Sequence, residues 1–262
     1  MNCAENLEML EKKLRADWNA ETNALYLAAA RDAETGDWIR MPLGEDRQAL
    51  YCFDAKDEEG RQLLVQAVLQ QLLLCYSPAQ AEIWYYGADA EALAAQQLPG
   101  TRCFPADRPE AFLDQLHQEL DRRHALMAAV GCRDYAAYCF RGITGVAFYH
   151  ALPRLIVLTD RWDDLAARLG TDGREALRAR CGRDGLALLA IGRGEGPALP
   201  GMHGLSLAPA GSGCWELRPE GGRPGILYTP TKEETAAVTA RLQEKAAAWR
   251  HAMAEAERRG AQ

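Results

Sequence analysis

The sequence predicts an α/β domain in which helices cover both faces of a mainly parallel central sheet. Residues 152–160 and 186–191 are almost continuously apolar, which is typical of strands buried on both faces. Longer amphipathic stretches alternate with the apolar ones, as they do in β-α-β units. The chain of 262 residues is 48% hydrophobic and 26% charged, so it is long and apolar enough to bury a sizeable core.

Three segments make up the predicted organisation. We expect an N-terminal helical segment over residues 1–35, because residues 4–32 intersperse charges with Ala and Leu. Residues 36–232 are expected to form the main domain. Residues 233–262 are predicted to form a charged, Ala-rich C-terminal helix with Thr231 as its candidate N-cap.

Turn residues and changes in periodicity place the elements of the main domain. The helix at 108–131 has an apolar stripe and a terminal Gly131, and its two histidines, His117 and His124, are expected at the surface. In chain order, we expect a short strand within 34–48, a strand at 49–53, a helix at 61–75, a strand at 82–86, a short helix within 91–100, a strand at 102–104, the helix at 108–131, a strand at 152–160, a helix at 174–185, a strand at 186–192, and short strands near 214–217 and 225–228.

The charge balance argues against nucleic acid as the main partner. The net charge is −7, whereas proteins that grip DNA usually present a positive face. A local basic stripe is the counter-argument, and its candidates are Arg174, Arg178, Arg180 and Arg183. We therefore predict weak DNA binding at physiological salt.

The cysteines and histidines show no metal-ligand spacing. None of the 8 Cys forms a CxxC pair and none of the 5 His forms an HxxxH pair, so no metal site is predicted. The Cys side chains are interpreted as small buried hydrophobes with reduced thiols. The first residues have no signal-peptide core and no segment is apolar enough to span a membrane, so a cytoplasmic protein is expected.

Two glycine-rich motifs fail as functional signatures. The segment that begins at Gly192 has Pro197 where a dinucleotide-binding loop needs its third glycine, and it precedes no predicted helix. The GSG at Gly211–Gly213 follows no strong predicted strand and precedes no helix, so it is not a nucleophile elbow. Both are expected to be ordinary loops.

The segment between the strand at 49–53 and the helix at 61–75 has the layout of a phosphate-binding loop. Against the Walker A pattern GxxxxGK[ST], the best register places Ala55, Gly60, Arg61 and Gln62 at the defining positions, so only Gly60 fits. Three consecutive carboxylates, on Asp57, Glu58 and Glu59, would oppose a triphosphate. The sequence therefore indicates a degenerate nucleotide site.

The apolar strand at 152–160 ends on Asp160. An Asp in this position is where a Mg²⁺-coordinating Walker B carboxylate is expected, although it could equally cap the next turn. The following residue is Arg161, which stays protonated and cannot act as a general base. No residue is therefore assigned a catalytic role.

Several segments share their order with one family. ELDRRHALMAAVGCRDYAAY (Glu119–Tyr138) contains an acidic residue, paired arginines, a glycine at a helix end, and then Arg and Tyr. With YSPAQAEIWYY, LPGTRCFPAD, LPRLIVLTD and RARCGRDGLALLAIGR, it resembles the FtsK/SpoIIIE family of P-loop ATPases, including the ATPase domains of the EssC and EccC motors of type VII secretion. The resemblance covers about residues 40–245. It implies a P-loop NTPase-like, RecA/FtsK-type three-layer domain with flanking terminal helices.

The departures from the family lie at the positions where catalysis occurs. The resemblance makes Arg61 and Gln62 the counterparts of the family's Lys and Ser, and Arg161 the counterpart of its catalytic Glu. Gly192 replaces the family's sensor Gln, beside a retained Arg193. ATP and Mg²⁺ are expected as cofactors only if the chain is active in spite of these changes.

Three hypotheses follow. The first is a pseudo-ATPase that binds a protein partner, such as an active ATPase subunit or a secretion substrate. The second is an unusual ATP-dependent DNA translocase or secretion ATPase in which Arg61 replaces the Walker A lysine, with subunits of a ring sharing sites through residues such as Arg193. The third is a structural adaptor that dimerises through its terminal helices.

Overall fold

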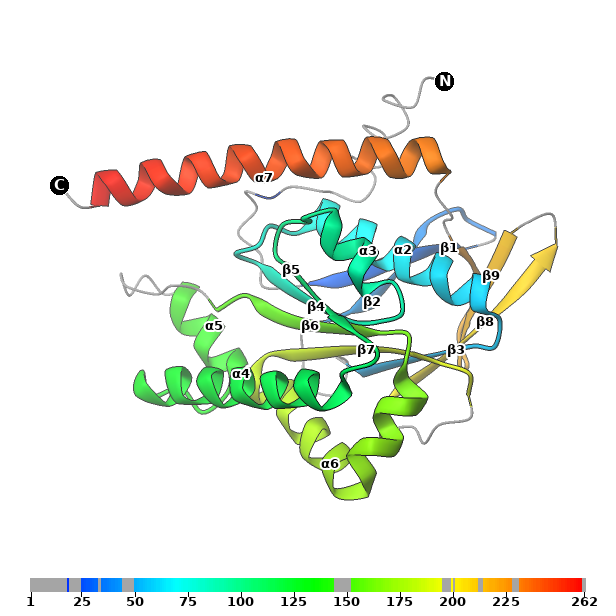
Figure 1. The fold of residues 1–262 in the computed structure, drawn as a ribbon, viewed down its shortest axis with the longest axis horizontal. Helices are drawn as coiled ribbons and strands as arrows, with labels where there is room; N and C mark the ends of the chain where they lie inside the picture. Colours follow the sequence, from blue (N-terminus) through cyan, green and yellow to red (C-terminus); the bar gives the residue numbers. More distant parts are fainter. Residues whose placement is uncertain are drawn as a thin grey trace.

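A computed structural model describes residues 18, 25–32, 34–43, 50–143, 152–194, 199, 201–211, 214–227 and 231–260. Its described strands form one sheet of ten, in the order β2-β1-β10-β9-β8-β3-β7-β6-β4-β5. Helices lie on both sides of this sheet (Figure 1). The three-layer α/β architecture predicted from the alternating pattern is therefore confirmed.

The parallel half of the sheet carries the edge at which the predicted nucleotide site lies. Every strand pair between β8 and β5 is parallel, because helices connect most of these strands. β6 and β7 are buried along their whole length, with Ile156 and Leu188 at 0% exposure, as their continuous apolar sequences predicted. The strands of this half are β8 (His203–Gly211), β3 (Leu50–Ala55), β7 (Leu186–Gly192), β6 (Arg154–Thr159), β4 (Ala81–Gly87) and β5 (Thr101–Pro105).

The antiparallel half corrects the prediction for the N-terminal segment. The helix expected through residue 32 is wrong at β1 (Tyr26–Asp32), which pairs with β2 (Trp38–Pro42) and β10 (Gly225–Leu227). The Ala-rich composition favours a helix, but pairing on both sides buries the apolar centre of β1 and overrides that propensity. The rest of residues 1–24, apart from Trp18, lies outside the described residues.

β8 was not predicted, because HGLSLAPAG contains the glycine and proline that usually interrupt strands. It pairs antiparallel with β9 (Cys214–Pro219). Gly211 therefore does follow a strand, contrary to the sequence interpretation. The chain nevertheless continues into a second antiparallel strand, β9, rather than into the helix that follows a nucleophile elbow.

Two hydrophobic layers hold the helices on the sheet. One face packs against α2 (Glu58–Cys75), the short α3 (Ala90–Ala95) and the first half of α7 (Lys232–Gly260). The other face packs against α4 (Pro109–Ala129) and α6 (Trp162–Asp184) (Figure 1). α5 (Tyr135–Ile143) contributes to a third, smaller cluster and was not predicted.

α6 begins twelve residues before the helix predicted at 174–185, because the early part of its sequence has no clear period. Gly170 interrupts it with a φ of 62°, a conformation that glycine adopts without strain. As expected, His117 and His124 are exposed on α4. None of the described helices combines the length and the apolar character that crossing a lipid bilayer requires.

Candidate functional site

The structure places the loop after β3 and the Asp160 that follows β6 at the same edge of the sheet. Both strands are parallel to β7, which lies between them, and the register aligns Thr159 with Ala190 and Ala190 with Cys52. With strands about 4.8 Å apart, the loop and Asp160 are separated by roughly 10 Å along the sheet. Ligand sites in open α/β sheets form at this carboxyl edge.

The first turn of α2 is capped by a side chain of the loop itself. Asp57 is the N-cap, and its Oδ1 accepts hydrogen bonds from the backbone N–H of Glu59 at 2.9 Å and of Gly60 at 3.3 Å. These are the free N–H groups with which a helix N-terminus binds a phosphate. The Asp57 carboxylate therefore occupies the position of the anion that a phosphate-binding loop would hold.

Arg61 turns back into the loop. Its Nη1 donates to the carbonyl oxygens of Ala55 at 3.0 Å and Lys56 at 3.3 Å, and its Nη2 donates to Glu58. The side chain of Arg61 is only 4% exposed. Nη1 and Nη2 of Arg61 already donate hydrogen bonds within the loop and to Glu58, so Arg61 stabilises the loop. To reach a phosphate, its guanidinium would have to break these bonds.

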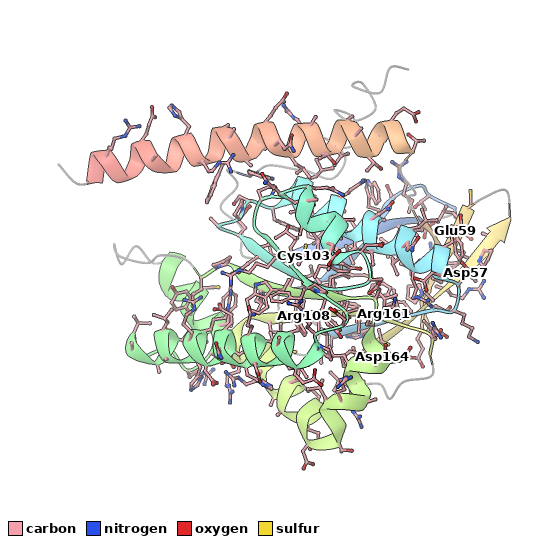
Figure 2. All side chains as sticks on the ribbon, viewed as in Figure 1. Asp57, Glu59, Cys103, Arg108, Arg161 and Asp164 are labelled. Atoms are coloured by element: carbon pink, nitrogen blue, oxygen red, sulfur yellow. The ribbon has the colours of Figure 1, made fainter. Side chains whose placement is uncertain are left out.

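Trp215 covers the start of α2 from β9. A Cβ atom placed on Gly60 would lie 2.5 Å from Cζ3 and 2.7 Å from Cη2 of the Trp215 ring. Trp215 is 7% exposed. Gly60 matches the Walker A pattern, but here its lack of a side chain makes room for an indole. Figure 2 shows Asp57 and Glu59 beside the β8–β9 hairpin that carries Trp215.

Asp160 is buried and held by neighbouring groups of β4 and the turn that follows it. Its Oδ1 accepts a hydrogen bond from the Ala88 N–H at 3.2 Å, and the Tyr85 hydroxyl also bonds to its carboxyl group. A side chain at Gly87 would collide with both groups. Burial raises the pKa of the Asp160 carboxyl above its usual range, although Arg161 and these hydrogen bonds act in the opposite direction.

Arg161 lies beside Asp160, with 4.0 Å between its Nε and Oδ1 of the carboxylate. The guanidinium therefore stands near the carboxylate that would coordinate a metal ion, and it carries a positive charge where a general base would be needed. Among the described residues, no group of three or more His, Cys, Asp or Glu side chains is arranged to hold a metal ion.

The end of β7 is occupied by Asp163 of α6. The Arg193 N–H donates to Oδ2 of Asp163 at 2.7 Å, and a Cβ on Gly192 would lie 2.8 Å from Oδ1. The Arg193 side chain is exposed. Gly192 thus leaves room for a carboxylate from the neighbouring helix.

A cavity of about 410 Å³ opens near the carboxyl end of β4, on the face that packs against α4 and α6. Tyr86 is a buried lining residue, and Asp164 and Arg168 carry the charges. Figure 2 shows Asp164 and Arg161 on this side of the molecule, apart from Asp57 and Glu59. The lining residues are Tyr86, Ala106, Pro109, Asp164, Ala167 and Arg168.

Sequence reasoning missed Trp215, Asp163 and Tyr85 as parts of this edge. Asp163 offered a signal, because an acidic residue in the first turn of a helix after a strand is common. Trp215 offered none, because it lies far along the chain and reaches Gly60 only through the pairing of β9 with β8 and of β8 with β3. Of the predicted positions, Arg61 donates to the Ala55 carbonyl, Gly60 directly precedes Arg61, and Gln62 is half-buried in the first turn of α2.

The fold is similar to that of the ATPase domains of type VII secretion proteins whose structures have been solved. No family model and no curated protein sequence matches the chain. Among solved structures, the chain is similar to the cytoplasmic domain of EccC from Thermomonospora curvata, with a TM-score of 0.66 and 19% identity over 86% of this chain and 32% of that one.

Two further structures contain ATPases 2 and 3 of such proteins. EssC from Geobacillus thermodenitrificans matches with a TM-score of 0.63 and 15% identity, over 88% of this chain and 50% of that one. EccC from Thermomonospora curvata, in complex with a signal sequence peptide, matches with a TM-score of 0.63 and 15% identity, over 87% of this chain and 48% of that one. The chain thus spans between a third and a half of the structures it resembles.

Proposed function

We propose that the chain is a catalytically inactive FtsK/SpoIIIE-like domain that acts as a protein-binding or regulatory module of a type VII-like secretion or DNA-translocation system. One observation carries the proposal: side chains of the protein itself fill the loop between β3 and α2, two from the loop and the first turn of α2 and one from β9. The Asp57 carboxylate accepts hydrogen bonds from the N–H groups at the start of α2, and Arg61 donates to the loop carbonyls. The Trp215 ring covers Gly60.

ATP would have to displace all three of these interactions. The displaced Asp57 carboxylate and its neighbours, Glu58 and Glu59, would then lie near the triphosphate, and each like-charge contact at ~4 Å costs about 1 kcal/mol in water and more near a protein surface. Arg161 supplies no base, and the loss of a general base lowers a rate by about 10²–10⁴-fold. We therefore expect the loop neither to bind ATP tightly nor to support its hydrolysis.

A protein is the partner that the remaining surface favours. The cavity at Tyr86, Asp164 and Arg168 has a buried aromatic residue and charged side chains, which suits a side chain of a polypeptide. The solved EccC complex with a signal sequence peptide supports a secretion substrate as partner, and an active ATPase subunit in an oligomer is the other candidate. We place the module in the cytoplasm, where the ATPases of such motors work.

DNA is disfavoured as a partner by the net charge and by the state of the arginines on α6. Arg180 bonds to Asp184 and Asp121, and Arg183 bonds to Asp184. Arg174 donates to the Ala166 carbonyl. Three of the four arginines of the predicted basic stripe are thus engaged within the protein, whereas Arg178 is exposed. This engagement supports weak rather than strong DNA binding. DNA binding that is sub-micromolar and falls steeply with added salt would contradict this part of the proposal.

Calorimetry with ATP·Mg²⁺ and a phosphate-release assay test the proposal. We expect neither tight binding nor turnover, and micromolar binding would instead indicate a nucleotide sensor. In a rebuilt variant, residues 57–59 become Gly, Arg61→Lys and Gln62→Ser restore the phosphate and Mg²⁺ contacts, and Arg161→Glu restores the base. A control with only the three Gly substitutions separates charge removal from restored contacts. Binding regained by the rebuilt variant would show that the pocket is degenerate.

One observation favours the alternative of an unusual ATPase. Asp160 keeps the strand-end position of a metal-binding carboxylate, at the same edge as the loop. If the chain is such a motor, turnover will be measurable in the unmodified protein and abolished by Asp160→Ala. The absence of turnover in both proteins would leave the inactive module as the function.

A further inference from the structure

The cavity between β4, α4 and α6 lies apart from the filled loop and has an aromatic wall. Tyr86 lines the cavity, and its ring is stacked on Phe112, with 4.8 Å between the two ring centroids. Burial raises the pKa of the Tyr86 hydroxyl, which donates a hydrogen bond to the Ala106 carbonyl oxygen at 2.9 Å. The phenol therefore stays neutral, and its oxygen can still accept a hydrogen bond from a molecule in the cavity.

Asp164 is the charged lining residue whose charge is not matched. Arg168, the other charged lining residue, forms an ion pair with Glu110 of the first turn of α4. Asp164 is exposed, and within the described part of the chain no hydrogen bond or ion pair engages its carboxylate. The charge of Arg168 is thus matched inside the protein, whereas that of Asp164 is left for a molecule in the cavity.

A negatively charged guest is the alternative, because the cavity borders the start of α4. Pro109 is the first residue of that helix, and its N-cap, Arg108, supplies no side-chain cap among the described contacts. Glu110, however, already places a carboxylate in the first turn, where it complements the helix dipole. Figure 2 shows Asp164 near the start of α4, so an anion in the cavity would also meet this carboxylate. The charges therefore favour a cation.

We propose that this cavity binds an arginine side chain of a polypeptide partner. The apolar stem of the arginine packs against the carbons of Ala106, Pro109 and Ala167. Its planar guanidinium pairs with Asp164 and lies against the Tyr86 wall. The cavity volume of about 410 Å³ lies within the range of ~300–1,000 Å³ that is usual for ligand sites, so it has room for an arginine and its neighbouring backbone. This binding role rests on the proposed function of a protein-binding module and names the side chain that the module recognises.

A titration of the full-length protein with two short peptides, followed by two-dimensional amide NMR, tests the charge requirement. The first probe is Gly-Arg-Gly with blocked ends. The second has citrulline in place of the arginine, which keeps the shape of the side chain and removes its charge. We expect saturable shifts of the amides of Ala106 and Ala167, and an affinity for the citrulline peptide that is at least about threefold lower.

Two pairs of variants locate the binding site. Asp164→Asn should weaken binding of Gly-Arg-Gly at least about threefold. The matched control Asp172→Asn, at an exposed position of the same helix outside the cavity lining, should leave the affinity unchanged. Ala167→Leu should fill the cavity and abolish the shifts, whereas Ala176→Leu, also exposed on α6, should not. Unchanged amide positions in β6 and β7 show that each variant is folded.

Four results would overturn the proposal. Equal affinity for the two peptides would show that the cavity does not recognise the charge. Tighter binding of blocked Gly-Glu-Gly would show that the start of α4 selects an anion instead. Shifts that persist unchanged in Asp164→Asn and Ala167→Leu would place the peptide elsewhere on the protein. The absence of saturable shifts in the unmodified protein would show that the cavity does not hold the side chain.

The peptide titration and the ATP measurements fail independently. Tight binding of ATP·Mg²⁺, together with arginine-specific binding in the cavity, would contradict the inactive module and leave the role of the cavity standing. If the protein binds neither ATP·Mg²⁺ nor the arginine peptide, the role of the cavity alone is contradicted.

Discussion

The indole of Trp215 packs against the backbone of Gly60, so closely that a Cβ on Gly60 would lie 2.5 Å from the ring. Gly60 is the one residue of the loop that satisfies the Walker A pattern. In a nucleotide-binding loop, glycine lets the backbone approach phosphate oxygens. In this protein the same freedom lets a strand from the antiparallel half of the sheet close over the start of α2.

This contact predicts the effect of Gly60→Ala. We expect the substitution to lower the free energy of unfolding by about 1–3 kcal/mol, because the new methyl group overpacks against the ring. In a Trp215→Ala background the same change should be neutral or stabilising by up to about 1 kcal/mol, since Ala is the better helix residue. Urea unfolding of the four proteins measures both effects.

Gln66→Ala, at an exposed position of the same helix, serves as the control and should change stability by less than about 0.5 kcal/mol. If Gly60→Ala were equally costly with and without Trp215, the contact between the two residues would not be the reason for the glycine.

Asp57 should matter for stability rather than for ligand binding. Asp57→Ala removes the cap from α2 and should cost about 1 kcal/mol of unfolding free energy. The neighbouring Lys56→Ala keeps the backbone carbonyl that bonds to Arg61 and should be nearly neutral. Thermal or urea unfolding compares the two variants. An Asp57→Ala protein as stable as the unmodified one would show that the carboxylate does not hold the helix end.

The raised pKa of Asp160 predicts a pH dependence with a definite sign. A carboxyl whose pKa is higher in the folded state contributes stability at low pH, and this contribution is lost as the pH rises through the folded pKa. Asp160→Asn keeps an acceptor for the Ala88 N–H but removes the charge. The variant should therefore gain stability relative to the unmodified protein as the pH rises above the ordinary aspartate value of 3.8.

Unfolding free energies of the two proteins between about pH 4 and pH 7 test this prediction, because the difference between them removes the contributions of all other groups. A difference that is constant with pH, or that favours the unmodified protein more at higher pH, would contradict it.

The paired arginines of α4 should differ strongly in their effect on stability. Arg123 is fully buried, and it bonds to Glu119 at 2.7 Å and to the Pro153 carbonyl at 2.6 Å. Arg122 makes its ion pair with the same Glu119 from a half-exposed position. Arg123→Ala should cost about 3–5 kcal/mol, because it leaves buried groups without a partner. Arg122→Ala should cost about 1 kcal/mol or less.

Denaturant unfolding of the two Ala variants gives the comparison, with each serving as the control for the other. Similar losses of unfolding free energy in the two variants would mean that Arg122 and Arg123 both act through surface charge. A large loss in Arg123→Ala alone would mean that this arginine ties α4 to the segment before β6.

Much of the parallel half of the sheet was predictable. β6 and β7 are buried on both faces, so nearly every residue in them is apolar and the pattern is local. The strand, acidic turn and helix around the loop were also predictable from sequence, because β3, the turn and α2 follow one another directly in the chain. β1 and β8 were missed because their strand conformation comes from partners distant in sequence, and their own Ala, Gly and Pro residues favour other structures.

The sequence by itself determined the α/β class, the central strands and the edge at which Asp160 lies. It also determined that Arg61, Gln62 and Arg161 stand where the resemblance expects Lys, Ser and Glu. These features follow from residue types and short-range periodicity. Only the tertiary structure decided what fills the degenerate site: Trp215 over Gly60, Asp163 beside Gly192, and Arg61 turned into its own loop. The physical reason is that strand pairing over long sequence separations and the rotamer of a buried side chain leave no periodic signal in the chain.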